Sequence, residues 1–157
     1  MAEHLPIDLW RQTHLGRLLD MASARFDARV LAVMAHNEDL TLALSHLAAR
    51  GKLTASHIQI TRHLPVSGCS LTELAIRAGV SKQAMGKLVD QCAAWDLVQR
   101  LPDARDARSV RVVFGPTGML WLGAYQMAVR QAETEFRLAV GAEVATVVHL
   151  GLEAYAA

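Results

Sequence analysis

The sequence predicts a mainly α-helical protein that carries one small β-hairpin. Aromatic residues make up 5% of the 157 residues and proline occurs four times, whereas alanine and leucine are abundant, which favours helices over an all-β structure. Apolar residues recur at helical spacing along most of the chain. Two short runs rich in β-branched residues, 97–101 and 109–114, interrupt this pattern and predict the two strands of the hairpin.

The N-terminal segment predicts one long amphipathic helix. Pro6 suits the first turn of a helix, and apolar residues then recur every four positions to about residue 33. A helix of about 28 residues is roughly 42 Å long, at the usual rise per residue. Because such a helix extends beyond a small domain, it needs a partner along its length. The recurring residues are Trp10, His14, Leu18, Ala22, Phe26 and Val30.

Two helices and a loop are predicted next. Capping residues favour a second helix at about residues 39–50. Thr54 is predicted to cap a third helix, which Pro65 stops. Residues 66–70 then form a loop, and the position of Cys69 within it leaves open whether its thiol is accessible.

Two short helices joined by a glycine turn follow. Either Ser70 or Leu71-Thr72-Glu73 is predicted to open the first helix, Gly79 to end it, and Ser81 to cap the second. The tight turn between them needs a residue that can adopt a positive φ, which glycine does readily. This arrangement is that of a helix-turn-helix. The apolar stripe of the second helix consists of Met85, Leu88, Val89 and Cys92.

The hairpin and the C-terminal helices complete the predicted fold. The hairpin tip at residues 102–108 is polar, charged and too long for a two-residue turn. Residues 115–118 end the hairpin and begin a long helix, which Gly141 separates from a final helix. Met119, Trp121 and Met127 recur at helical spacing and are interpreted as the core of a dimer interface.

A helix-turn-helix followed at once by a hairpin with a basic tip is a winged helix, a module that binds DNA. Its second helix fits the major groove, which is about 12 Å wide. Arginines at the wing tip can enter the minor groove or contact its phosphates, and hydroxyls at helix starts suit phosphate oxygens. The candidate DNA-binding residues are Ser70, Thr72, Ser81, Lys82, Gln83, Ala84, Lys87, Arg105, Asp106 and Arg108.

The distribution of charge supports this interpretation. The chain has 16 Lys and Arg and 15 Asp and Glu, a net charge of +1 that argues against a simple polycation. Residues 52–116 hold nine Lys and Arg against five Asp and Glu, a net charge of +4. The net charge is −1 over residues 1–51 and −2 over residues 117–157. A net positive charge is therefore confined to the segment expected to contact DNA.

These motifs resemble the MarR family of bacterial winged-helix transcription regulators. The resemblance covers about residues 53–118, and its most specific part is Asp103-x-Arg105-Asp106-x-Arg108 in the wing, followed by a strand and Thr117-Gly118. It implies that Arg105 reaches the minor groove. It also implies that Asp103, Asp106 and Arg108 shape the wing tip by ion pairing.

The resemblance also implies an overall organisation. Residues 1–51 would supply a dimerisation helix and an extra helix, residues 52–116 the winged helix, and residues 117–157 further dimerisation helices. The expected protein is a homodimeric repressor that binds a palindromic operator in double-stranded DNA and is released by a small effector. His14 and His57 lie on helices that border the effector cleft in this family, although a partly buried structural role is an alternative for either residue.

Three departures distinguish this chain from the family pattern. Gly86 stands in the second helix where a small hydroxyl residue is common, which weakens that helix by about 0.5–1 kcal/mol relative to alanine. Asp96 replaces the usual glycine before the first wing strand, and Asp tolerates the left-handed conformation better than most residues. The helix at about 39–50 is interpreted as an insertion.

Other classes of function find less support. A winged helix that binds protein instead of DNA is the main alternative. No catalytic motif, phosphate-binding loop or cofactor motif is apparent, so neither an enzyme nor a cofactor is expected. The spacing of His57 and His63 does not place them on one helical face, which disfavours a metal site. The sequence contains no signal peptide or membrane-length apolar run, which predicts a cytoplasmic protein with reduced thiols.

Overall fold

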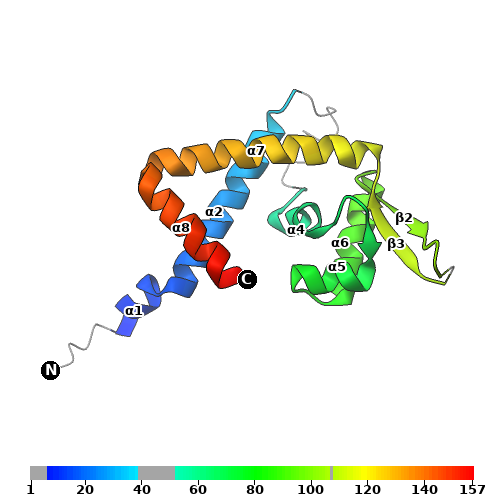
Figure 1. Ribbon diagram of the computed structural model, residues 1–157, viewed down its shortest axis with the longest axis horizontal. Helices are drawn as coiled ribbons and strands as arrows, with labels where there is room; N and C mark the ends of the chain where they lie inside the picture. Colours follow the sequence, from blue (N-terminus) through cyan, green and yellow to red (C-terminus); the bar gives the residue numbers. More distant parts are fainter. Residues whose placement is uncertain (1–6, 39–51, 107) are drawn as a thin grey trace.

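A computed structural model describes residues 7–38, 52–106 and 108–157 of the chain (Figure 1). It confirms a mainly helical fold with a small antiparallel sheet. In the view of Figure 1, the long helix α7 runs across the upper part of the molecule and is crossed by α2, with α8 below one end of α7 and the winged helix below the other. The elements are α1 (Ile7–Thr13), α2 (Leu15–Ala35), α4 (Ala55–His63), β1 (Cys69–Ser70), α5 (Leu71–Ala78), α6 (Lys82–Ala94), β2 (Val98–Pro102), β3 (Val110–Phe114), α7 (Pro116–Val140) and α8 (Ala142–Ala156).

The long N-terminal helix predicted from the sequence is divided in two at His14. This residue has extended backbone angles (φ −71°, ψ 150°), and its Nδ1 accepts a hydrogen bond from the backbone N–H of Arg17 at 3.2 Å. His14 therefore caps α2 where the prediction placed it inside one continuous helix. The apolar spacing continues across the break, so periodicity alone did not reveal it. The helix predicted at about residues 39–50 lies outside the described residues.

The start of α4 agrees with the prediction that Thr54 caps it. The backbone N–H of Thr54 donates to His57 Nδ1 at 3.0 Å, so His57 takes the place that Glu or Gln usually has in a capping box. The helix ends before Pro65, as expected.

The helix-turn-helix is confirmed at its caps and its turn. Ser70 Oγ accepts from the Glu73 N–H, and Ser81 Oγ accepts from the Ala84 N–H, each at 3.1 Å. Gly79 has φ +66°, the left-handed conformation that the turn requires. The predicted apolar stripe of α6 faces the core, with Leu88 half-buried and Met85, Val89 and Cys92 fully buried.

The sheet has one strand more than the hairpin predicted from the sequence. Strands β2 and β3 pair antiparallel, from Val98 opposite Phe114 to Pro102 opposite Val110. Strand β1 pairs with the other edge of β3, where the sequence predicted a loop. A strand of two residues is too short to show the alternation by which strands are recognised in a sequence.

Strand β1 decides the environment of Cys69. Cys69 belongs to this strand and is 3% exposed, so the interpretation of Cys69 as part of a loop is wrong. Burial raises the pKa of the Cys69 thiol, and it raises the pKa of Cys92 to about 12. Both thiols are therefore protonated and unreactive at neutral pH.

The junction between α6, the wing and α7 requires unusual backbone positions. Asp96 has φ +59°, and its Oδ2 accepts a hydrogen bond from Thr117 Oγ1 at 2.9 Å. The expectation that Asp96 adopts the left-handed conformation is confirmed. A Cβ atom on Gly118 would overlap the carbonyl oxygen of Leu97, so α7 approaches the start of the wing as closely as glycine permits.

The interpretation of Trp121 as part of a dimer core is wrong, because it belongs to the core of the protomer. The residue is 3% exposed, and its Nε1 donates to Thr61 Oγ1 of α4 at 3.1 Å. Met119 and Met127 on the same helix are 45% and 60% exposed. Helical spacing grouped the three residues, but it does not distinguish the side of α7 that is buried within the protomer from the sides that are exposed.

Within the described residues, no helix is both long enough and apolar enough to pass through a bilayer.

Candidate nucleic-acid interface

Helix α6 presents a polar face that its buried face holds in place. Met85, Val89 and Cys92 anchor the helix in the core. The predicted contact residues of α6, which begin at its first turn, are all exposed. They are Lys82, Gln83, Ala84 and Lys87.

Capped helix starts lie beside this face. Because Ser70 Oγ and Ser81 Oγ each accept a backbone N–H, each hydroxyl keeps its own proton available for donation. Thr72 is exposed in the first turn of α5. These hydroxyls are suited to donate to phosphate oxygens while continuing to cap their helices.

The wing tip is shaped by two consecutive turns of the same kind. Asp103 Oδ1 accepts from the backbone N–H of Arg105, and Asp106 Oδ1 accepts from that of Arg108, each at 2.9 Å. These are Asx turns, in which the carboxylate bonds the backbone two residues on. Asp103 and Asp106 thus shape the tip as expected, but through hydrogen bonds to backbone N–H groups, where ion pairing was expected. The backbone bonds leave the Arg105 and Arg108 side chains exposed on a hairpin that projects from the body (Figure 1).

An ion pair that the sequence did not reveal connects α6 to the wing. Arg100 Nη2 of β2 lies 2.6 Å from Asp90 Oδ1 of α6, and both side chains are largely exposed. The two residues are ten positions apart on different elements, so no helical or strand spacing could have paired them. The pair joins α6 to a wing strand.

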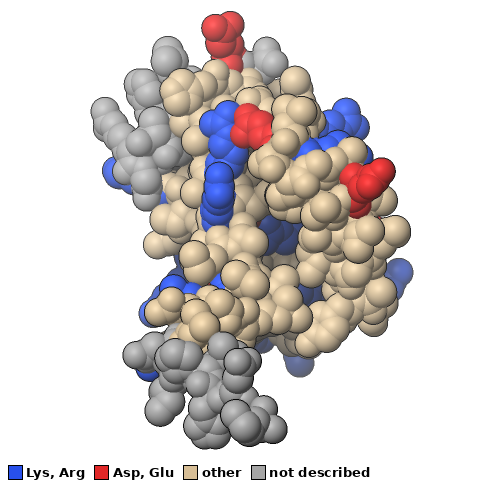
Figure 2. All heavy atoms as spheres, turned by 90° about the vertical axis from the view of Figure 1, so that its left-hand side faces the viewer, with Lys and Arg blue, Asp and Glu red and all other residues tan. Residues whose placement is uncertain are grey.

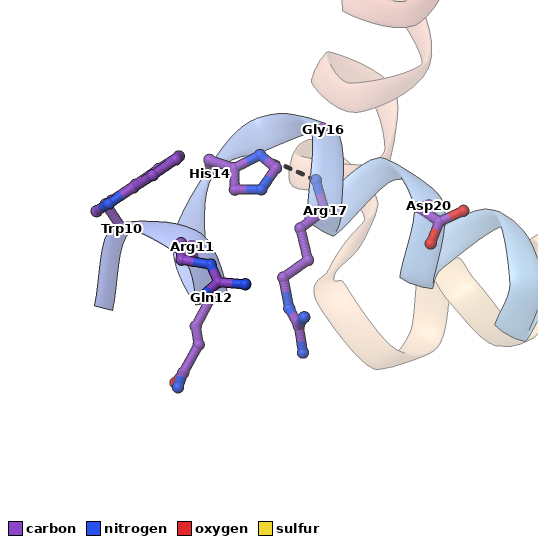
Figure 3. A pocket seen from close by; sticks show the side chains of 7 residues that line it. All are labelled: Trp10, Arg11, Gln12, His14, Gly16, Arg17 and Asp20. Carbon is purple, nitrogen blue, oxygen red and sulfur yellow. Dashed lines mark hydrogen bonds between the residues drawn. The ribbon is translucent and has the colours of Figure 1, made fainter. Parts of the chain in front are cut away.

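The two histidines proposed for an effector pocket lie in different environments. His14 lines an open hollow of about 640 Å³ at the break between α1 and α2 (Figure 3). The Trp10 ring lies 5.8 Å from the His14 ring, and Figure 3 shows the Arg17 side chain extending along the same hollow. The residues that line it are Trp10, Arg11, Gln12, His14, Gly16, Arg17 and Asp20.

His57 is buried and does not line this hollow. Its Nδ1 accepts from Thr54, so its Nε2 carries the proton and donates to Gln91 Oε1 at 2.7 Å. Its ring also packs against Trp95, 4.9 Å away. His57 thus joins α4 to α6 through contacts that already use both ring nitrogens.

The end of the molecule away from the winged helix exposes many apolar side chains. Figure 2 shows the side formed by α8 and its neighbours, where uncharged surface predominates. Exposed apolar side chains gather on α1, on the N-terminal half of α2, at the end of α7 and on α8. They include Leu9, Trp10, Leu15, Leu18, Met21, Phe136, Leu138, Val140, Val144, Val147, Val148, Leu150, Leu152 and Tyr155.

Over the described ranges, no three His, Cys, Asp or Glu side chains come together in a way that could hold a metal ion.

Comparison with known proteins points to one family. Residues 58–109, from α4 to the wing tip, match the model of the MarR family. A search of curated proteins finds no significant match.

Solved structures share the fold across almost the whole chain. The transcriptional repressor CouR bound to a 23-mer DNA duplex is 19% identical, with a TM-score of 0.68 over 98% of this chain and 99% of that one. The reduced form of MarR from E. coli is 23% identical, with a TM-score of 0.68 over 90% and 96%. BpsR from Bordetella bronchiseptica, whose structure concerns regulation of DNA binding by 6-hydroxynicotinic acid, is 18% identical, with a TM-score of 0.65 over 93% and 96%.

Proposed function

We propose that this chain, whose residues 58–109 match the model of the MarR family, is a sequence-specific DNA-binding transcription regulator of that family. The observation that carries the proposal is the exposed polar face of α6, placed between the capped start of α5 and a wing with two exposed arginines. The fold shared with a repressor bound to duplex DNA supports it.

In this proposal each part of the interface has a distinct role. Helix α6 enters the major groove, where Gln83 can bond base edges and Lys82 and Lys87 can bond bases or phosphates. Ser70, Thr72 and Ser81 donate to phosphates, which set the position of the protein on the duplex without selecting sequence. Arg105 and Arg108 at the wing tip approach the minor groove.

We propose further that the protein acts as a homodimer. The apolar side chains exposed on α1, α2, α7 and α8 form a surface that a second copy would cover. Two copies of α6 would then contact successive major grooves, about 34–36 Å apart on one face of the duplex, which accounts for a palindromic operator.

Repression released by a small effector is the third part of the proposal. CouR is described as a repressor, and DNA binding by BpsR is regulated by a small acid. The hollow at the α1–α2 break, with His14 and Trp10 in its wall, is the site we propose for the effector in this chain. Screening small molecules for release of bound DNA tests it, and the His14→Ala variant should lose the response to any compound found.

Selection from random duplex DNA tests the central proposal. The wild-type chain should recover a palindromic sequence whose affinity falls steeply with salt concentration. The triple variant K82A/Q83A/K87A should bind that sequence at least tenfold more weakly, because it loses base and phosphate contacts. A failure to recover any sequence would favour the winged helix as a protein-interaction module, and unchanged affinity in the variant would refute α6 as the element that contacts DNA.

The chain offers a matched control for this variant. Gln126, Arg130 and Arg137 on α7 are also exposed and also comprise one glutamine and two cations. Replacing these three residues with alanine changes the net charge equally but leaves α6 intact. DNA affinity should then fall much less than in the α6 variant.

A further inference from the structure

The turn that precedes α5 packs directly on the wing. Residues 65–68 form this turn, closed by a hydrogen bond of 2.8 Å from the Gly68 N–H to the Pro65 carbonyl. Gly68 has φ +77°, and a Cβ on it would lie 2.6 Å from the carbonyl oxygen of Val112 on β3. The turn therefore fits against β3 only because Gly68 has no side chain.

A single arginine side chain bonds this turn. Arg111 of β3 donates from Nε and Nη2 to the Ser67 carbonyl at 3.2 and 2.8 Å, and from Nη2 to the Gly68 carbonyl at 2.8 Å. Because Gly68 is buried, its carbonyl needs a partner inside the protein. Arg111 supplies that partner.

The same arginine lies opposite the cap of α5. In the β1–β3 pairing, Arg111 is the register partner of Ser70, whose Oγ caps α5 through the Glu73 N–H. The turn, the cap and β3 are thus joined at one residue. Strand β3 leads directly from the wing tip, so this junction relates the start of α5 to the tip that carries Arg105 and Arg108.

We propose that Arg111 is a positioning residue for DNA binding, which holds the first turn of α5 in register with the wing so that both contact phosphates together. The proposal rests on the proposed DNA-binding function. Arg111 acts here through the backbone it bonds, and Ser70 and Thr72 make the contacts. Its guanidinium is suited to this role because Nε and Nη2 reach two successive carbonyls from one rigid plane.

Amide hydrogen exchange in the full chain without DNA tests whether Arg111 holds the turn. In Arg111→Met, which keeps an apolar stem but loses all three hydrogen bonds, the Glu73 amide should exchange about tenfold faster. The Ala84 amide, capped in the same way by Ser81, is the internal control and should not change. Equal protection of Glu73 in both proteins would overturn the proposal.

A double-mutant cycle tests the link to DNA, using a duplex selected by the wild-type chain. Arg111→Met and Thr72→Val should each weaken binding about tenfold, the size expected for a hydrogen bond to a charged group. The double variant should also bind DNA only about tenfold more weakly than the wild type. Once the loss of Arg111 has displaced α5, Thr72 no longer contacts the phosphate, so removing its hydroxyl costs nothing more. Independent losses, which multiply to about a hundredfold, would contradict the proposal.

Two further variants separate geometry from charge. Arg111→Lys keeps the positive charge but cannot bond both carbonyls from one plane, so it should recover less than half of the lost binding energy. Arg100→Met removes one cation from the other wing strand and should leave the effect of Thr72→Val unchanged. Full recovery by lysine would mean that Arg111 acts as a charge, and it would overturn the positioning role.

The two experiments also separate this proposal from the proposed function. A wild-type chain that selects no DNA would overturn the proposed function and the role of Arg111 in binding. Hydrogen exchange would still decide whether Arg111 holds the turn.

Discussion

At the scale of single residues, one buried carboxylate connects α2 to α4. Asp27 of α2 is 5% exposed, and its Oδ1 accepts from Arg62 Nη2 of α4 at 2.6 Å. Burial by itself would lower the pKa of Arg62, but its hydrogen bonds to Asp27 and Tyr125 raise the pKa above its ordinary value. Because the Arg62 side chain is 34% exposed, water solvates the cation better than the carboxylate.

This difference in exposure predicts unequal effects of removing the two partners. Arg62→Met leaves a buried charge unpaired and should lower the free energy of unfolding by about 3 kcal/mol. Asp27→Asn leaves a partly hydrated cation and should cost about 1 kcal/mol. The double variant should be more stable than Arg62→Met alone. Urea denaturation measures all three, and equal losses in the two single variants would contradict this account.

Two glycines should respond oppositely to substitution with alanine. A Cβ on Gly86 in α6 would lie 3.8 Å from Leu71 Cδ2, its nearest neighbour, so Gly86→Ala should raise the free energy of unfolding by about 0.5–1 kcal/mol. A Cβ on Gly118 in α7 would overlap the Leu97 carbonyl, so Gly118→Ala should destabilise the protein. Thermal unfolding of the two variants gives the signs, and a loss of stability in Gly86→Ala would refute the first.

At the scale of elements, α2 and α7 are joined by an exposed ion pair. Arg29 bonds both carboxylate oxygens of Glu135, at 2.6 and 2.7 Å, and Gln131 also donates to this carboxylate. The hydrogen bond from Arg29, followed by that from Gln131, lowers the pKa of Glu135 from 4.5 to about 2. A carboxyl with a lowered pKa stabilises the folded state wherever it is ionised in both states.

This shift predicts a dependence of stability on acid. The contribution of the pair should be fully present above about pH 4.5 and should be lost as the pH falls toward 2. Glu135→Gln should remove this part of the pH dependence, and the change should be small because both side chains are exposed to solvent. Denaturant midpoints at pH 6 and pH 3 measure it. Identical pH profiles for the variant and the wild type would show that the pair does not stabilise the fold.

At the scale of the whole molecule, the two ends differ in the charge and polarity of their surfaces. The winged helix carries a net positive charge, whereas α8 and the neighbouring helix ends, on the side drawn in Figure 2, carry exposed apolar side chains. Helix α8 contacts α7, and Ala145 is the single buried residue of α8. Because α8 is rich in apolar residues and buries little of its apolar surface within its own chain, it is suited to bury that surface against a second copy.

The homodimer is tested by charges placed on α8. Val147→Glu with Leu150→Glu should convert the dimer to a monomer at micromolar concentration, because both side chains are exposed in the protomer and would be buried in the dimer. Ile76→Glu, at an equally exposed apolar residue of α5, is the control and should leave the dimer intact. Sedimentation velocity distinguishes these results. A folded wild-type monomer at that concentration would refute the dimer.

The sequence alone was sufficient for the features that depend on near neighbours in the chain. The serine caps, the left-handed Gly79 and Asp96, the wing strands and the exposed face of α6 were all predicted. The caps depend on a side chain bonding the backbone three residues away, and Gly79 and Asp96 adopt a conformation that their own chemistry permits. The strands and the exposed face of α6 follow from the pattern of apolar and β-branched residues along the chain.

The tertiary structure decided what depends on contacts between distant segments. The addition of β1 buried Cys69, the packing of α4 placed Trp121 in the core, and the Asp27–Arg62 and Asp90–Arg100 pairs join separate elements. The spacing of residues along the chain does not reveal such contacts, because they form only when the fold brings two separate helices or strands together. The sequence therefore determined the parts of the candidate DNA interface, and the three-dimensional packing, with Arg111 on the turn before α5, determined how those parts are held together.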